Sequence, residues 1–221
     1  IFLASCVKNE PFIQAYSVPP SYDFEHNDSS ATARLIMMFG MKNYLATGAT
    51  IQIDSAIVDS IWLNRGKPFT AAMVPDFLYS DLLLNKMTST TLLSATTNID
   101  TLSAFADSVV LNSPFHNSSA GDGVPGTATI SQPVSEKKLF SKDGVVYEEV
   151  WYNAMLGAMA LNNIFNRLST TGTTAGDAWN LAFDYTGLPK DYDPSINYEA
   201  APLRKNRPSG ISAFFGTAAK D

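Results

Sequence analysis

Carboxylates near the C-terminal end are the residues best suited to bind a metal ion. Asp184, Asp191 and Asp193 lie close together in the sequence, and Glu199 follows them. Carboxylate oxygens in a loop are the ligands that a hard cation such as calcium prefers. The spacing does not match an EF-hand loop, so the sequence predicts a candidate cation site of another type.

Aromatic residues in the same region are candidates for a ligand groove. They are Trp179, Tyr185, Tyr192 and Tyr198. Loops over a rigid bundle commonly carry binding functions, and the proline-rich segment 189–202 is predicted to be such a loop. Aromatic side chains at helical spacing are also typical of a packed core, which is the alternative interpretation.

The two histidines lie in separate turns. His26 has Glu25 and Asp28 beside it, which would allow a metal site, whereas an exposed turn residue is the alternative. His116 is expected to be an exposed loop residue. Neither histidine has the flanking pattern of a Ser-His-Asp or Cys-His set, so the sequence predicts no catalytic residues.

Glu148 and Glu149 begin the longest predicted helix. Carboxylates there complement the positive end of the helix dipole, which is sufficient reason for their presence. A metal site formed together with Asp143 is the alternative.

The single cysteine indicates where in the cell the protein is located. Cys6 follows Leu3-Ala4-Ser5, the pattern of a bacterial lipobox, in which a diacylglycerol is attached to the cysteine thiol. On this interpretation residues 1–5 are a signal-peptide remnant and 6–21 form a lipid-anchored tether. The chain would then sit on the periplasmic or cell-surface face of the outer membrane. A buried cysteine in a cytosolic chain is the alternative.

Composition excludes several classes of protein. The 221 residues are 45% hydrophobic and carry a net charge of −6, which is typical of a globular chain. The acidic balance and the lack of a basic stripe argue against nucleic-acid binding. No apolar run reaches the roughly 18 residues of a membrane-spanning helix. The length predicts a single domain over residues 22–221.

Helical periodicity predicts the fold class. The sequence indicates an all-α helical bundle with one long central helix over about 145–168, long loops and little or no strand. A long loop is expected over 113–135 and an irregular segment over 189–221, because prolines and glycines interrupt both. The other helices are expected at 30–46, after the N-cap Asp54, near Pro75, at 99–112 and after Thr174 or Asp177.

The long helix carries a heptad of apolar residues. Trp151, Ala158 and Phe165 lie seven positions apart, which places them on nearly one face of a regular α-helix. We therefore expect this face to be dry and packed against neighbouring helices.

A series of short motifs resembles one family of lipoproteins. The motifs occur at Val18–Phe24, Thr32–Leu35, Met41–Leu45, Asn64–Phe69, Gly144–Glu149, Met155–Met159 and Trp179–Tyr185. Their order is similar to that of a Bacteroidota lipoprotein family catalogued as a domain of unknown function and associated with the imelysins, which are iron-regulated lipoproteins. The family chains are usually longer and carry more acidic or histidine residues before the Trp179 motif.

This resemblance implies a membrane-anchored lipoprotein that binds a ligand or partner in iron or nutrient uptake. The association with imelysins makes iron a candidate bound ion, beside the calcium that the loop carboxylates suggest. One alternative is a structural or assembly subunit of an outer-membrane or cell-surface complex. Another is an imelysin-type metal-dependent peptidase, although the Gly-x-His-x-x-Glu motif of imelysins is missing from this sequence.

Overall fold

The fold is predominantly helical, as the sequence predicts. The computed structural model describes residues 29–70, 73, 99–131, 135–169, 172 and 174–186, and all structural statements concern these residues. Its longer helices are α1 (Ser29–Ala46), α2 (Ser55–Trp62), α3 (Ile99–Asn112), α4 (Tyr147–Met155), α5 (Asn162–Leu168) and α6 (Ala175–Asp184). Two short 3-10 turns, η1 (Thr47–Ala49) and η4 (Ser113–Phe115), follow α1 and α3.

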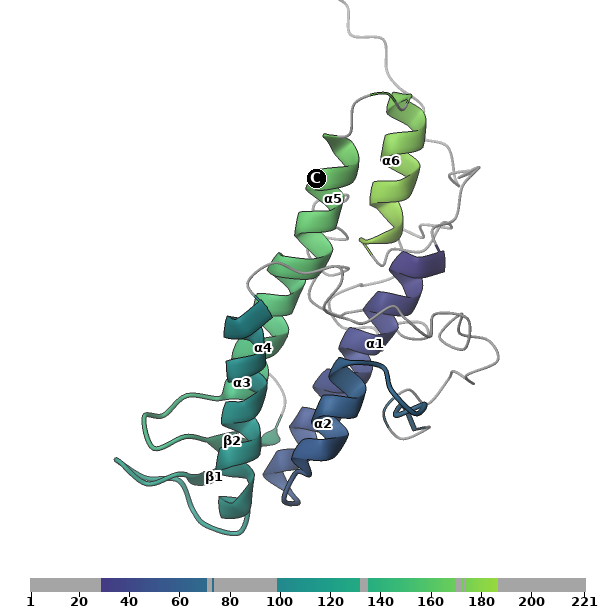
Figure 1. Cartoon of the computed structure of the whole chain (residues 1–221). Helices are drawn as coiled ribbons and strands as arrows, with labels where there is room; N and C mark the ends of the chain where they lie inside the picture. The colour runs from purple at the N-terminus through teal and green to yellow at the C-terminus, as the bar shows by residue number, and fades with distance from the viewer. Residues whose placement is uncertain are drawn as a thin grey trace, which may run out of the picture.

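One long helix forms the axis of the molecule. The helix α4, the π-helical segment η5 (Leu156–Leu161) and α5 follow one another without a break, so the chain is helical over 147–168 (Figure 1). The predicted helix over 145–168 is therefore confirmed, with a start two residues later. In Figure 1, α1, α2 and α3 lie beside the lower half of this axis, and α6 packs on α5 at the other end.

Side chains from α1 and the long helix fill the core. Met38, Met41 and Leu45 of α1 are buried, as are Trp151 and Met155 of the long helix. Flexible methionines suit a core assembled from helices that cross at different angles. The helix α2 adds Trp62, whose ring meets that of Trp151 edge-on, with 6.0 Å between the ring centroids.

Local capping explains where several helices begin. The carboxylate of Asp54 accepts a hydrogen bond of 2.8 Å from the backbone N–H of Ala56, which caps α2 as predicted. Thr174 caps α6 by accepting from the N–H of Asp177 at 3.1 Å. The inner face of α2 carries Val58, Ile61 and Trp62, which are buried, whereas Ile57 is exposed.

A two-stranded sheet begins within the segment that the sequence predicts as a loop. The strands β1 (Gly126–Ile130) and β2 (Glu136–Phe140) pair antiparallel, with Gly126 opposite Phe140 and Ile130 opposite Glu136. The prolines and glycines beside these strands favour a loop, so the sequence pattern does not predict the hairpin. The expected loop over 113–135 therefore contains β1, and the all-α class becomes a mostly helical fold with one small hairpin.

The predicted dry face of the long helix is wrong beyond its first turns. Trp151 is fully buried, Ala158 is half-buried, and Phe165 is 64% exposed. The reason is the π-helical segment between them, because one π turn holds about one extra residue and rotates the following chain by about 100°. The core face therefore passes from Met159 to Ile164, five positions later, instead of to Phe165.

Among the described helices, none combines the length and apolar character that crossing a bilayer requires.

Candidate functional site

An apolar groove opens between α3 and the second half of the long helix. Its volume is about 510 Å³. The first turns of α3 form one wall with Thr101, Leu102 and Phe105. The long helix forms the floor and the other wall with Ala154, Gly157, Ala158, Leu161, Asn162 and Phe165. A volume of this size lies within the range of ordinary ligand pockets.

The lining of the groove is apolar and uncharged. Among the described residues that line it, Thr101 and Asn162 are the only polar side chains, and none is acidic or basic. An occupant of this groove therefore presents an uncharged, mainly apolar surface, because a charged group would lose its hydration with no counter-charge to replace it.

Small residues on the floor leave room for close approach. Ala154, Gly157 and Ala158 follow at helical spacing. A Cβ atom built on Gly157 meets no described atom within 4 Å, so nothing described in the chain requires a glycine here. A glycine within a helix costs roughly 0.5–1 kcal/mol relative to alanine. The smallness of this position is therefore not explained by the packing of the described chain.

The π-helical segment is what exposes the groove. It rotates Phe165 out of the core and leaves Leu161 and Ala158 half-buried at the surface. Single π turns inside α-helices occur frequently at functional sites. The heptad of Trp151, Ala158 and Phe165 was visible in the sequence, but it indicates packing without showing which part of it faces the core.

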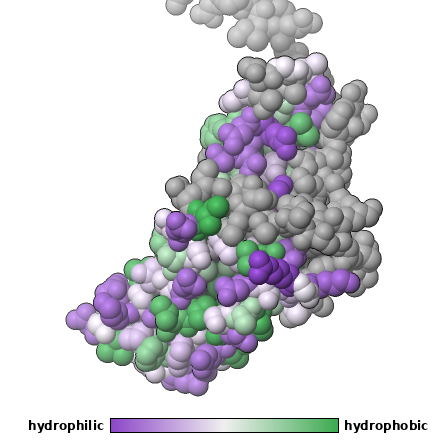
Figure 2. Space-filling model, in the orientation of Figure 1, coloured by the Kyte–Doolittle hydropathy of each residue, from purple (hydrophilic) through white to green (hydrophobic). Residues whose placement is uncertain are grey.

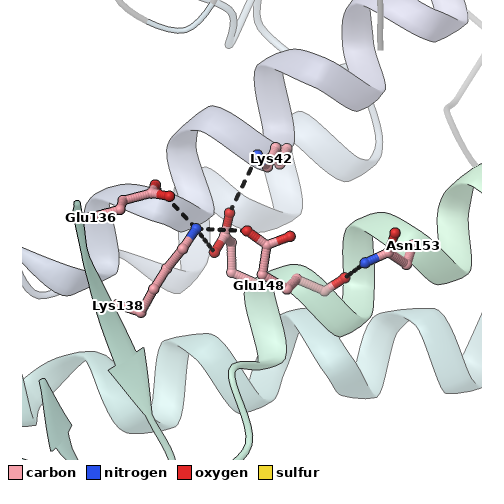
Figure 3. Close-up of polar contacts among 6 residues, drawn as sticks. Lys42, Glu136, Lys138, Glu148 and Asn153 are labelled. Atoms are coloured by element: carbon pink, nitrogen blue, oxygen red, sulfur yellow. Dashed lines mark hydrogen bonds and ion pairs between the residues drawn. The ribbon is translucent and has the colours of Figure 1, made fainter. Parts of the chain in front are cut away.

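A second cluster is a group of charges around the buried side chains of Lys138 and Glu148 (Figure 3). The Lys138 ammonium on β2 lies 3.0 Å from Glu136 Oε1, 3.2 Å from Glu148 Oε2 and 2.6 Å from Glu149 Oε1. Lys42 of α1 lies 3.8 Å from the other oxygen of Glu148. These contacts connect the hairpin, the long helix and α1.

Burial and charge act in opposite directions within the cluster. Burial raises the pKa of the Glu148 carboxyl, and the neighbouring Glu149 adds to this rise, while Lys138 and Lys42 oppose it. Burial alone would lower the pKa of Lys138. Its hydrogen bond to Glu149 and the charge of Glu148 outweigh burial, so the pKa of Lys138 is raised. Lys138 and Glu148 therefore each oppose, through their charge, the effect that burial has on the pKa of the other.

This cluster fastens elements together and leaves little room for a ligand. The side chains of Lys138 and Glu148 are 7% and 6% exposed. The cavity beside them measures about 10 Å³, which is about the size of one water molecule. Glu148 and Glu149 lie in the first turn of α4, as the sequence predicts, while Asp143 pairs with Lys142 on the surface at 2.9 Å.

The aromatic groove predicted near the C-terminal end is not assembled by its described members. Trp179 is 49% exposed, whereas Tyr185 is buried and its hydroxyl accepts a hydrogen bond of 3.4 Å from Arg34 Nη1. The two residues lie six positions apart, which on an α-helix places their side chains about 120° apart around the axis. Tyr192 and Tyr198 lie outside the described residues.

The predicted ion ligands are only partly placed. Asp184 is the last residue of α6, while Asp191, Asp193, His26 and the lipidation candidate Cys6 lie outside the described residues. His116 ends the turn after α3, where its Nδ1 is 2.9 Å from Ser113 O. Within the described ranges, no three side chains of His, Cys, Asp or Glu come together as a metal site.

Surface composition differs along the molecule. On the face drawn in Figure 2, hydrophilic residues cover much of the α5 and α6 end, whereas hydrophobic and hydrophilic residues are mixed over the lower half.

Comparisons with known proteins leave function to be argued from this geometry. No family model, no curated protein and no solved structure matches the chain.

Proposed function

We propose that this chain is an outer-membrane lipoprotein, anchored through a lipid on Cys6, that binds a ligand or partner through the apolar groove between α3 and the long helix. The groove is the observation that carries the proposal. It leaves Phe165 64% exposed, and contiguous exposed apolar surface on a folded protein commonly marks an interaction site. The role in iron or nutrient uptake follows from the family resemblance.

The shape of the groove also favours the alternative of an assembly subunit. Its floor follows the long helix from Ala154 to Phe165, about three helical turns. An amphipathic helix laid in a hydrophobic groove is a common mode of protein recognition. A partner that binds in this way would make the chain part of a larger complex at the cell envelope.

The anchor is tested separately from the groove. The chain is produced from its full reading frame in a bacterial host supplied with labelled palmitate. We expect label on the wild-type chain and its loss in Cys6→Ala, with release of the variant from the membrane fraction. Equal labelling and equal fractionation of the two chains would show that Cys6 carries no lipid.

The groove is tested by photo-crosslinking in cells. A photoreactive benzoylphenylalanine replaces Phe165 in one chain and Leu111 in another. Leu111 is the matched control, because it is also an exposed apolar helix residue, 73% exposed, and does not line the groove. We expect a discrete crosslinked species from position 165 that is missing from position 111. Gly157→Leu should abolish this species, because the leucine fills the space above the floor.

Equal crosslinking from both positions would contradict the proposal, since it would show that the groove has no occupant of its own. Persistence of the position-165 species in the Gly157→Leu chain would do the same.

A further inference from the structure

We propose that the groove binds a second copy of this chain, with the two long helices antiparallel about a two-fold axis through Leu161. This inference rests on the proposed function, because it names the partner of the same groove. It makes a symmetric, closed dimer in which each copy supplies both the projecting side chain and the floor that receives it.

The register of the long helix is self-complementary. In an antiparallel pair, residues equally distant from the axis face one another. An axis at Leu161 sets Phe165 of one copy opposite Gly157 of the other, four positions to either side. It also sets Leu168, which is 44% exposed, opposite Ala154. Each large exposed side chain thus meets a small residue on the floor of the partner groove.

This arrangement explains why position 157 is a glycine. A Cβ there would meet no described atom of the same chain, although the glycine costs helix stability. The ring of Phe165 from a second copy would occupy that space. Complete burial of a phenylalanine removes about 150–250 Å² from water, and the 64% of Phe165 that is exposed is the part that association can still bury in each copy.

Charge also favours this face for self-association. The chain carries a net charge of −6, so two copies repel over most contacts. The described lining of the groove has no charged residue, so two linings that face each other place no like charges of their own in contact. Anchoring in one membrane would raise the effective concentration of the copies and so favour a dimer of modest intrinsic affinity.

Sedimentation of the full 221-residue chain with Cys6→Ser gives the first test. We expect a dimer whose dissociation constant rises more than about tenfold in Phe165→Asp, a change of at least about 1.4 kcal/mol. Gly157→Leu should weaken the dimer similarly, while the control Leu111→Asp leaves it unchanged. Circular dichroism melts of the same variants show whether each monomer stays folded.

Formation of a disulfide gives the second test, because it shows which residue lies next to the two-fold axis. Leu161→Cys in the Cys6→Ser chain should form an intermolecular disulfide under mild oxidation, since two residues on a two-fold axis lie side by side. Asn153→Cys, an exposed position on the same helix outside the groove, should remain reduced. Equal oxidation of both cysteines would overturn the proposed axis.

The outcomes separate this inference from the proposed function. A crosslinked species of twice the chain mass that contains only this chain supports both. A monomer at about 1 mM, with crosslinks to other molecules at position 165, overturns the dimer and leaves the proposed function standing. A monomer whose melting temperature falls steeply in Phe165→Asp also overturns the dimer, because the groove is then filled by the same chain.

Discussion

The ammonium of Lys138 lies 3.2 Å from a carboxylate oxygen of Glu148, and both side chains are buried. Lys138 belongs to the strand β2 and Glu148 to the first turn of α4, so this pair joins the hairpin to the long helix. A buried ion pair is balanced between desolvation and attraction, so removal of one partner costs far more than removal of both.

We therefore expect Lys138→Met to destabilise the fold by about 3–5 kcal/mol at neutral pH. Glu148 would keep its burial and lose its principal counter-charge. The double variant Lys138→Met with Glu148→Leu should recover most of the loss, because no buried charge remains without a partner. Urea unfolding of both single variants and the double variant gives the free energies of unfolding for this double-mutant cycle. Additive losses would show that the two side chains do not depend on each other.

The loss of stability at alkaline pH should depend on Lys138 and Tyr44. The pKa of Lys138 is raised through Glu149 and Glu148 despite burial, and burial raises the pKa of Tyr44. A group with a raised folded-state pKa stabilises fully below its unfolded pKa, and this contribution is lost as the pH rises above it. Both unfolded values lie near 10. Stability from these groups should be constant between pH 7 and 9 and fall above about pH 10.

Thermal or urea unfolding between pH 7 and about pH 11 measures how the free energy of unfolding changes with pH. Lys138→Met with Glu148→Leu should show a shallower fall, because the lysine is gone. A fall of equal steepness in the double variant would exclude Lys138 as a cause.

Two aromatic residues on the long helix should differ sharply in their effect on stability. Trp151 is fully buried against Trp62, so Trp151→Ala should cost about 3–5 kcal/mol. Phe165 is 64% exposed, so Phe165→Ser should cost less than about 1 kcal/mol at low protein concentration. Denaturant midpoints of the two variants decide the matter, and equal losses would mean that the π turn does not rotate Phe165 away from the core.

Gly126 should be intolerant of any side chain. A Cβ there would lie 2.6 Å from Ser118 O and from the carbonyl carbon of Ser119. Both are backbone atoms that cannot swing aside, so Gly126→Ala should displace the loop before β1 at a cost of about 1–3 kcal/mol. Gly121→Ala is the matched control, since its Cβ meets nothing within 4 Å. Similar melting temperatures for the two variants would contradict the close packing of this loop.

Local patterns were enough to predict most of the helices. The helix α3 runs over 99–112 as its apolar spacing predicts, and the N-caps Asp54 and Thr174 mark the starts of α2 and α6. Capping and amphipathic periodicity involve residues within one or two turns, so one sequence contains the information. The long central helix is confirmed for the same reason.

The hairpin, the groove and the charge cluster depend on contacts between distant residues. The side chain of Lys138 looks like a surface charge in the sequence until folding sets it against Glu148. The heptad through Trp151 and Phe165 predicts one continuous dry face only if the helix is regular. The π turn over Leu156–Leu161 breaks this regularity, and the spacing of the apolar residues does not predict it. The sequence by itself determined where the helices form, and the tertiary structure decided which of their apolar residues are buried and which remain open to a partner.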